Sequence, residues 1–316
     1  MTLSKRDKRL LAELSTNARE KQTVIAKRLR TSPQTTKYNL DALQENNTYT
    51  PHAIIDPARL GLLTIQTILS YTTFNKHTQQ DIIEELTQQP DVVRIQRLRL
   101  GADLLVEYAV PNLSYFNKTH TAFLHRHSDA IRNKITYPVL VRYTFQKTYL
   151  HPKTKHKRMI LSGDREPATI SDTEQQTLHA LINQPQASTA ELARTTNHDP
   201  RTTRNAIQSL EKKKVIRGYS IDLNYQQTNI TSALLGIQFS HLDPREMKRF
   251  IEFTSSHEEV VELTKVIGQE RVYVTIETLT NYTQVIEELR EEFKITNYTV
   301  FEAGNKHKNT YAPTTN

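Results

Sequence analysis

The sequence predicts an α+β fold built twice, with a winged helix-turn-helix module followed by a ferredoxin-like βαββαβ module in each copy, arranged as a pseudo-dimer inside one chain. The first observation is an internal repeat at a spacing of about 167 residues, which places Pro33 on Pro200 and Leu43 on Leu210. The second is that each copy opens with three short helices. The third is that each copy continues in the order βαββαβ, which leaves one sheet face without helices to cover it.

The best-defined helix of the second copy begins at Pro200. Asp199 can accept hydrogen bonds from the free amides of the first turn, and proline suits the first helical position because its missing N–H has no partner there. Thr203, Ile207 and Leu210 form one buried stripe at spacings of four and three. The opposite face carries hydrogen-bond donors and acceptors: Arg201, Thr202, Arg204, Asn205 and Gln208.

Two shorter helices precede this one. Ser171 with Glu174 three residues later is a capping box, and a second helix follows Ser188. A tight turn leads into the third helix, and the apolar pair Val215-Ile216 then leads into a strand. This layout is that of a winged helix-turn-helix, whose last helix enters the DNA major groove.

The βαββαβ order is visible in both copies. In the first copy, strands are predicted at 63–74, 92–100, 102–110 and 135–150, with helices at 77–89 and 113–127; in the second, strands at 232–240, 259–267, 271–278 and 296–303, with helices at 243–256 and 282–293. Val272, Val274 and Ile276 alternate with more polar neighbours, so the other face of this strand needs a cover. We expect the sheet of the other copy to provide it.

The domain boundaries follow from this reading. We expect a first winged helix-turn-helix at 1–56, a first βαββαβ module at 57–150, a basic linker at 151–168, a second winged helix-turn-helix at 169–222, a second βαββαβ module at 223–304 and a flexible tail at 305–316. The linker is either a solvated tether or a segment that follows a phosphate backbone. Residues 51–150 hold eleven Lys/Arg against eight Asp/Glu and residues 223–304 hold seven against thirteen, which favours pairing of the unlike modules.

Composition excludes several classes of function. The 316 residues contain no cysteine, which excludes disulfides, thiolate catalysis and cysteine-ligated metal centres. Only seven glycines occur, and no glycine-rich nucleotide-binding loop is present. The N-terminus enters a charged helix and no apolar run is long enough to span a bilayer, so we expect a cytoplasmic protein. The net charge of +8 and the pI of about 9.4 favour polyanionic partners.

The order of modules resembles the Lrp/AsnC (leucine-responsive regulatory protein) family of prokaryotic transcription regulators. Residues 199–219 are similar to that family's recognition helix and wing entry, and residues 170–193 are similar to its first two helices. The first copy departs from the pattern, because Asn47 replaces the usual glycine and Thr48-Tyr49 replaces an apolar pair. The resemblance implies paired RAM-type effector modules and two recognition helices presented to successive major grooves of double-stranded DNA.

Each predicted recognition helix supplies candidate DNA-binding residues near its start, because these positions reach base edges. They are Gln34, Thr35, Lys37 and Tyr38 in the first copy, and Arg201, Thr202, Arg204, Asn205 and Gln208 in the second. Because the two helices differ, we expect an imperfect palindrome as the preferred site. Candidate phosphate contacts are Arg28, Arg30, Lys212, Lys213, Lys214 and Arg217.

The resemblance also implies an effector site at the hairpin between the second and third strands of each βαββαβ module. The residues at these places are Gly101, Asp103, Gly268 and Arg271. An amino acid is the expected kind of effector, and an ordinary hairpin glycine is the alternative. No cofactor is expected. His120, His125 and His127 lack a nearby pair of carboxylates, so no metal site is expected either.

Two alternatives to a sequence-specific regulator stay open. A chromatin-like protein that compacts DNA without an operator uses the same basic residues. Siroheme decarboxylases resemble the same tandem architecture, and Arg94, Arg97, Arg99 and Arg142 are the arginines that would clamp carboxylates. The aromatic-rich segment of those enzymes is not recognisable and the chain has no tryptophan, so the sequence favours a protein that is not an enzyme.

Overall fold

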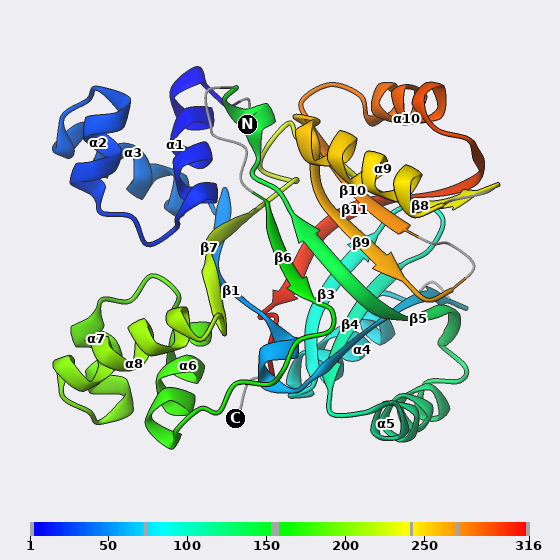
Figure 1. Ribbon diagram of the computed structural model, residues 1–316, viewed down its shortest axis with the longest axis horizontal. Helices are drawn as coiled ribbons and strands as arrows, with labels where there is room; N and C mark the ends of the chain where they lie inside the picture. The colour runs from blue at the N-terminus through cyan, green and yellow to red at the C-terminus, as the bar shows by residue number, and fades with distance from the viewer. Residues whose placement is uncertain (1–2, 73–74, 153–157, 241–242, 269–271, 314–316) are drawn as a thin grey trace.

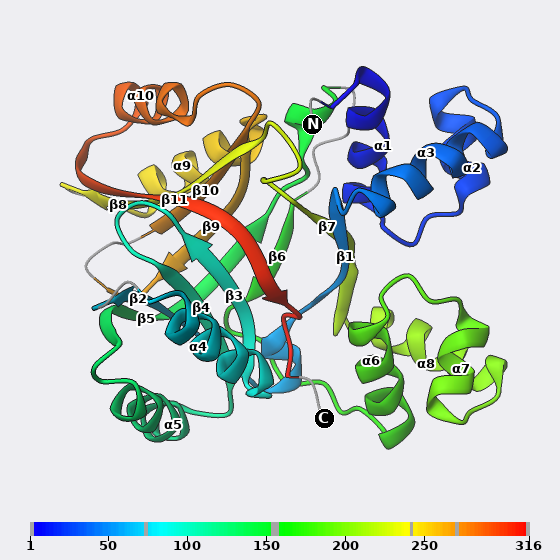
Figure 2. The ribbon, with the colours of Figure 1, turned by 180° about the vertical axis from the view of Figure 1, so that it is seen from behind.

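A computed structural model describes residues 3–72, 75–152, 158–240, 243–268 and 272–313. Two three-helix heads lie side by side, and a β-barrel wrapped by four helices lies next to them (Figures 1 and 2). This arrangement is an α+β fold with two winged helix-turn-helix modules, each followed by a βαββαβ module, paired within one chain. The longest described helix has 14 residues, and the described helices lack the length and apolar content of a membrane span.

Each head consists of three capped helices. They are α1 (Lys5–Thr16), α2 (Gln22–Leu29) and α3 (Pro33–Glu45) in the first head, and α6 (Asp172–Asn183), α7 (Thr189–Thr196) and α8 (Pro200–Lys212) in the second. Capping boxes start α1, α6 and α7 at Ser4, Ser171 and Ser188. The turn before each third helix is made by a residue with positive φ, Arg30 in the first head and Asn197 in the second. The predicted helix starts at Pro33 and Pro200 are observed.

The two heads share one small sheet. Strand β1 (Tyr49–Ile55) follows α3, strand β7 (Ile216–Leu223) follows α8, and the two strands pair with each other in antiparallel register. The sequence predicts a wing after each recognition helix, and the structure joins both post-helix strands across the heads instead. This pairing buries Ile54 and Ile55 from one head with Ile216 and Ile221 from the other in a common core.

Eight strands of the two βαββαβ modules form a closed barrel. The first module supplies β2 (Leu63–Tyr71), β3 (Val92–Leu98), β4 (Leu104–Val110) and β5 (Ile131–Thr144), and the second supplies β8 (Thr231–Phe239), β9 (Val260–Val266), β10 (Val272–Thr278) and β11 (Ile295–Asn309). Their order is β2-β4-β3-β11-β8-β10-β9-β5, and pairing of β5 with β2 closes the ring. Closure leaves these eight strands without a free edge between the modules.

The long strands β5 and β11 join the modules. Strand β5 pairs first with β2 of its own module and then with β9 of the other, while β11 pairs first with β8 and then with β3. Short 3₁₀ turns flank the first module at Pro57–Leu60 and Thr148–Leu150. The helices α4 (Lys76–Gln88), α5 (Leu113–Arg126), α9 (Pro244–Ser256) and α10 (Tyr282–Glu292) cover the outside (Figure 1).

The sheet faces turned away from the helices meet inside the barrel. Tyr137 stacks on Tyr273 with ring centroids 4.6 Å apart, and Leu105 packs in the same cluster as Phe301. Val272, Val274 and Ile276 lie in the core under α9 and α10, whereas Glu277 on the opposite face is buried inside. The two faces therefore cover each other, as expected, although charged side chains share the interior.

Two predicted flexible segments are partly ordered. The predicted tail at 305–316 is wrong at its start, because residues 305–309 continue β11 and Tyr311 and Ala312 are buried with the core of the heads. The linker at 151–168 contains strand β6 (Met159–Ser162), which pairs with β5. Its lysines at 153, 155 and 157 lie outside the described residues. Residues 306–309 are held by pairing with the distant strand β3, and the linker strand β6 is held by pairing with β5, the strand that precedes it in the chain.

Candidate nucleic-acid interface

Helix α8 presents a polar face on a fixed apolar base. The Asp199 carboxylate accepts hydrogen bonds from the backbone N–H groups of Arg201 and Thr202 at 2.8 and 3.1 Å, and a hydrogen bond from the Thr202 hydroxyl is the main cause that lowers the pKa of Asp199. Thr203 and Leu210 are fully buried beneath the helix. The predicted DNA-contacting residues Arg201, Arg204, Asn205 and Gln208 are exposed, and Thr202 is half-buried beside its cap.

Helix α3 presents the equivalent face in the first head. Ser32 caps it by accepting a hydrogen bond from the Thr35 N–H at 3.0 Å, and Thr36, Leu40 and Leu43 hold it to the core. Tyr38 is 75% exposed, so its ring is available to a partner. All four predicted contact residues of this head are exposed: Gln34, Thr35, Lys37 and Tyr38.

Both recognition helices belong to heads on the same side of the barrel (Figures 1 and 2). The paired strands β1 and β7 run between the heads, and Ala18 N–H donates a hydrogen bond to the Tyr219 carbonyl at 3.3 Å. The Arg19 guanidinium lies 5.3 Å from the centroid of the Tyr219 ring and donates a hydrogen bond to the Pro185 carbonyl of the other head. These contacts fix one head relative to the other.

The predicted phosphate contacts fall into two groups. Arg30, Lys212 and Lys214 are exposed, and no ion pair of these side chains occurs among the described residues. Arg28 instead bridges Glu13 and Glu20 at 3.0 Å each, and Arg217 lies 3.7 Å from the buried carboxylate of Asp56. Two of the six predicted phosphate contacts, Arg28 and Arg217, therefore already lie beside carboxylates of the protein.

Lys213 belongs to the engaged group. Its ammonium donates to both oxygens of Glu174 at 2.7 and 2.8 Å. Partial burial opposes ionisation of Glu174, but the hydrogen bonds from Lys213, Ser209 and the Ser171 backbone together outweigh it and lower the pKa of that carboxyl to about 2. This ion pair ties the end of α8 to the start of α6, so Lys213 has a structural partner that the sequence spacing does not reveal.

The predicted effector residues have mixed placements. Gly101 adopts φ +78° in the turn between β3 and β4, and a Cβ there would lie 2.9 Å from Val300 O. The Asp103 carboxylate accepts the backbone N–H of Tyr71 at 2.8 Å, so it has a structural role in this turn. Gly268 lines a surface groove, and Arg271 lies outside the described residues.

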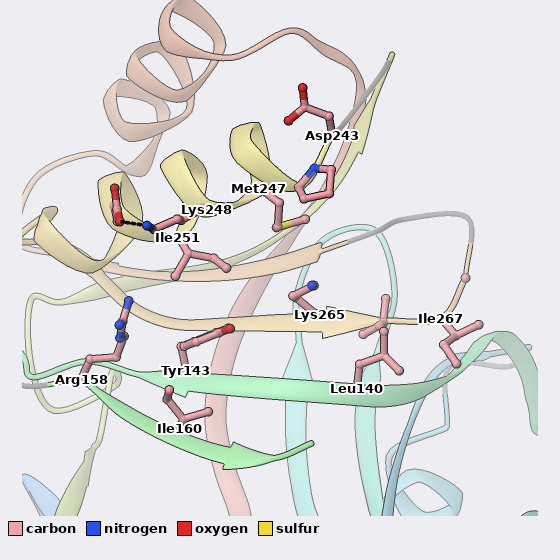
Figure 3. A pocket seen from close by; sticks show the side chains of 14 residues that line it. Leu140, Tyr143, Arg158, Ile160, Asp243, Met247, Lys248, Ile251, Lys265 and Ile267 are labelled. Carbon is pink, nitrogen blue, oxygen red and sulfur yellow. Dashed lines mark ion pairs between the residues drawn. The ribbon is translucent and has the colours of Figure 1, made fainter. Parts of the chain in front are cut away.

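That groove has a volume of about 810 Å³ and lies between α9 and the strands β9, β5 and β6 (Figure 3). Leu140 and Ile267 at one end are 43% and 58% exposed. Arg158 stands over the Tyr143 ring at 5.7 Å from its centroid, and Lys265 has no ion pair among the described residues. The groove was not predictable from the sequence, in which its one local signal is the apolar run Met159-Ile160-Leu161 inside the basic linker.

The four arginines that could bind the carboxylates of a siroheme-like ligand already have partners within the protein. Arg94 pairs with Glu262 at 3.1 Å, and Arg142 donates to Glu107 at 2.9 Å, all inside the barrel. On the outside, Arg97 donates to His307 at 2.9 Å and Arg99 lies 3.4 Å from Glu302. Three of these guanidinium groups, those of Arg94, Arg142 and Arg99, therefore already pair with carboxylates of the protein itself, and that of Arg97 pairs with an imidazole.

The three clustered histidines of α5 do not converge. The His120 ring stacks on Phe116 with centroids 4.9 Å apart, and burial lowers the pKa of this imidazole to about 4. His127 pairs with Glu85 at 2.6 Å. Within the described ranges, no group of three or more His, Asp or Glu side chains is arranged to hold a metal ion.

Comparisons with known proteins give one match to the first head and separate matches to nearly the whole chain. A family model described as winged helix-turn-helix DNA-binding matches residues 3–47, which make up most of the first head. No curated protein matches the chain.

Among solved structures, the siroheme decarboxylase NirDL is 13% identical, covers 99% of this chain and 95% of its own, and has a TM-score of 0.56. The structure of NirDL in co-complex with an iron-uroporphyrin III analogue is 12% identical, covers 98% of this chain and 94% of its own, and has a TM-score of 0.56. An AsnC family transcriptional regulator from Agrobacterium tumefaciens is 19% identical, covers 45% of this chain and 94% of its own, and has a TM-score of 0.39. These similarities concern the fold.

The comparison corrects one expectation from the sequence. The chain was expected not to be an enzyme, because the aromatic-rich segment of siroheme decarboxylases is not recognisable in it and it has no tryptophan. That expectation is wrong, because a siroheme decarboxylase has the same architecture over 99% of this chain. Architecture alone therefore does not separate a regulator from an enzyme in this case.

Proposed function

We propose that this protein is a sequence-specific, double-stranded DNA-binding transcription regulator of the Lrp/AsnC type that uses α3 and α8 together. The observation that carries the proposal is the pair of capped helices with exposed polar faces, on two heads joined by β1 and β7 on one side of the barrel. A helix of this kind fits the major groove, and two heads in one chain fit two half-sites on one duplex.

Chemistry supports base recognition by these faces. Arg204 and Arg201 are suited to guanine, and Asn205, Gln208 and Gln34 are suited to adenine, because their donors and acceptors match the major-groove edges. Arg30, Lys212 and Lys214 supply sequence-independent attraction to phosphates. The proposal includes a small-molecule effector such as an amino acid, and the groove beside Gly268 is the place where the chain offers room for it.

The test is selection of bound duplexes from a random DNA pool, using the full chain and three variants. We expect two unlike half-sites spaced by about 10 base pairs or a multiple of this. Tyr38→Ala should relax one half-site and Arg204→Ala the other, each with a loss of about 1–3 kcal/mol for the affected site. Arg132→Ala, an exposed arginine of β5, is the charge-matched control and should leave both half-sites intact.

Failure of the selection has a clear meaning. If no sequence is enriched, and random duplex binds as tightly as the recovered duplexes at every salt concentration, the protein compacts DNA without an operator. The regulator proposal would then be wrong. If Tyr38→Ala and Arg204→Ala change nothing while a motif is still enriched, α3 and α8 are not the recognition helices.

A second candidate function is decarboxylation of a siroheme-like tetrapyrrole. The observation that favours it is the groove of about 810 Å³, which combines the Tyr143 ring and an apolar floor with the cations Arg158 and Lys265 (Figure 3). A planar ligand with several carboxylates needs that combination of surfaces. Titration of the protein with siroheme, followed by its absorption spectrum and by detection of released CO₂, tests this function. Lys265→Ala should weaken binding, and an unchanged spectrum with the unaltered protein would exclude it.

A further inference from the structure

A second cavity lies within the first head, away from the groove of Figure 3. It has a volume of about 340 Å³ and is enclosed by α1, by the segment between α2 and α3, and by α3. Its floor is apolar and is made by Leu10 and Leu29. Three cations from α1 surround it: Lys5, Arg6 and Arg9. We call this cavity the α1 pocket.

The charge of the α1 pocket is not compensated locally. No aspartate or glutamate is among its described lining residues, and none of its three cations has an ion pair within the described part of the chain. The Nε atom of Arg9 is buried and has no hydrogen-bond partner there. Cations grouped in a concave site raise the local positive potential, and a buried guanidinium N–H without an acceptor favours an incoming anion.

Polar groups complete the wall on the side of α3. The hydroxyls of Thr31 and Thr36 lie 2.8 Å apart and form one hydrogen bond, which leaves further lone pairs and one proton between them. Asn39 adds its side-chain amide, whose Nδ2 donates to the Thr35 carbonyl at 2.7 Å. The pocket therefore places fixed donors and acceptors opposite the three cations.

The second head shows that the fold does not require these cations. At the positions 167 residues later, Asp172, Thr173 and Gln176 replace Lys5, Arg6 and Arg9. There, Gln176 Oε1 and His198 Nε2 form a hydrogen bond at 2.9 Å, which joins α6 to the segment before α8. In the same three-helix scaffold, a hydrogen-bonded side-chain pair thus stands in the second head where the first head has a pocket lined by three cations.

We propose that the α1 pocket binds the phosphate group of a small phosphorylated molecule. A phosphate monoester carries close to two negative charges at neutral pH and three acceptor oxygens, which suits several cations and hydroxyls around one point. The pocket is larger than a phosphate group, and its floor of Leu10 and Leu29 offers an apolar surface to a small organic body. This inference needs only the first head and goes beyond the proposed function.

The pocket is distinct from the predicted base-contacting face. Thr36 and Asn39, which line it, lie on the side of α3 toward α1, whereas Gln34 and Tyr38 point away from the core. A bound phosphate ester would therefore rest beside the recognition helix and not on its DNA-facing surface.

The experiment is calorimetric titration of the full chain with glycerol 3-phosphate, with inorganic phosphate as the second probe, in the absence of DNA. We expect saturable binding at one site, with tighter binding of the ester. Arg9→Gln should weaken binding at least tenfold, and the double variant Lys5→Gln with Arg6→Gln should do the same. The second variant changes exposed residues only, so it remains informative if Arg9→Gln does not fold. Arg132→Gln is the matched control and should stay within twofold.

Three results would overturn the proposal. The first is no saturable binding of either probe to the unaltered protein at millimolar concentration. The second is binding that the Arg9 and Lys5/Arg6 variants retain, or that Arg132→Gln weakens equally. The third is a loss of duplex affinity in these variants without any ester binding, because the cations would then contact the DNA backbone. Since no DNA is present in the titration, failure here is independent of failure of the regulator proposal.

Discussion

Lys212 and Lys213 are sequence neighbours whose side chains have different surroundings. Lys212 is exposed without an ion pair among the described residues, whereas Lys213 is bound to Glu174. A lysine that neutralises a phosphate releases counterions, and each such contact contributes about 0.9 to the slope of log K against log salt concentration. An already neutralised lysine contributes less.

This difference gives a matched pair of variants. Lys212→Gln should reduce the salt slope of duplex binding by about 1, and Lys213→Gln should leave it nearly unchanged. Binding measured at several salt concentrations tests this. An unchanged slope for Lys212→Gln would show that Lys212 does not contact a phosphate, and an equal reduction for Lys213→Gln would show that Lys213 contacts one despite Glu174.

His120 makes stability depend on pH. Burial lowers the pKa of His120 to about 4, below the ordinary value near 6.5, so the unfolded chain takes up a proton at a higher pH than the folded one. The free energy of unfolding therefore falls as pH decreases from 6.5 toward 4. This contribution is fully present above pH 6.5.

Replacement of the ring isolates this contribution. His120→Phe keeps an aromatic ring against Phe116 and cannot be protonated. When the pH is lowered from 7 to 4.5, the free energy of unfolding should fall by about 2–3 kcal/mol less in this variant than in the unaltered protein. Urea unfolding at the two pH values gives the comparison, and identical losses would mean that His120 is not held neutral by burial.

At the level of elements, the turn between β3 and β4 depends on Gly101. Its φ of +78° disfavours other residues, and a Cβ would also lie 2.9 Å from both Val300 O and Phe301 Cδ1 of β11. Gly61 shares the positive φ, but the nearest atom to its Cβ position is 3.5 Å away. A substitution at Gly61 therefore tests the cost of the backbone conformation alone, and one at Gly101 adds a steric clash with β11.

Alanine at these two positions should have unequal effects. Gly61→Ala should cost about 1–2 kcal/mol of unfolding free energy, because only the backbone conformation is penalised. Gly101→Ala should cost about 2–5 kcal/mol, because crowding against β11 is added. Chemical denaturation measures both, and equal costs would indicate that β11 does not pack on this turn.

Elements with local signals were predictable from the sequence. The caps at Ser4, Ser171 and Asp199 act within a single turn, so local spacing was enough to predict where these helices begin. Pairing between distant segments was not predictable. Nothing near β1 indicates that its partner is β7, the strand that follows the third helix of the other head.

Polar sequences were also misleading where the partner lies far away. Residues 305–309 contain lysine, histidine and asparagine and read as a tail, yet Lys306 pairs with Asp222 and Asn309 donates to the same carboxylate. Lys213 read as a free phosphate contact, yet Glu174 is its partner. Side-chain pairs across such separations have no local signature.

At the scale of the whole molecule, a buried ion pair joins the two halves. Arg94 and Glu262 are the third residues of β3 and β9, which are equivalent strands of the two modules. Their side chains face each other inside the barrel at 3.1 Å. Burial opposes ionisation of Glu262, but the positive charges of Arg94 and Arg142 outweigh it and lower the pKa of Glu262 to about 2. Pairing of two first modules would oppose Arg94 to Arg94, so this position favours the unlike pair.

The pair can be tested by removing one or both charges. Glu262→Leu leaves Arg94 buried with one partner fewer and should cost about 3–5 kcal/mol of unfolding free energy. The double variant Arg94→Leu with Glu262→Leu should regain most of that loss. Chemical denaturation of the unaltered protein, the two single variants Glu262→Leu and Arg94→Leu, and the double variant measures the coupling. A double variant as unstable as the sum of both single changes would contradict it.

The central claim is that one chain, closed by β5 and β11 into a barrel, holds two unlike DNA-reading heads at a fixed separation. Affinity for a selected duplex, measured as its two half-sites are moved apart by 5 and then by 10 base pairs, tests this most directly. A fixed pair of heads predicts a sharp loss at 5, where the second site lies on the opposite side of the helix, and a partial recovery at 10, where it returns to the same side. Affinity that does not depend on spacing would contradict the claim.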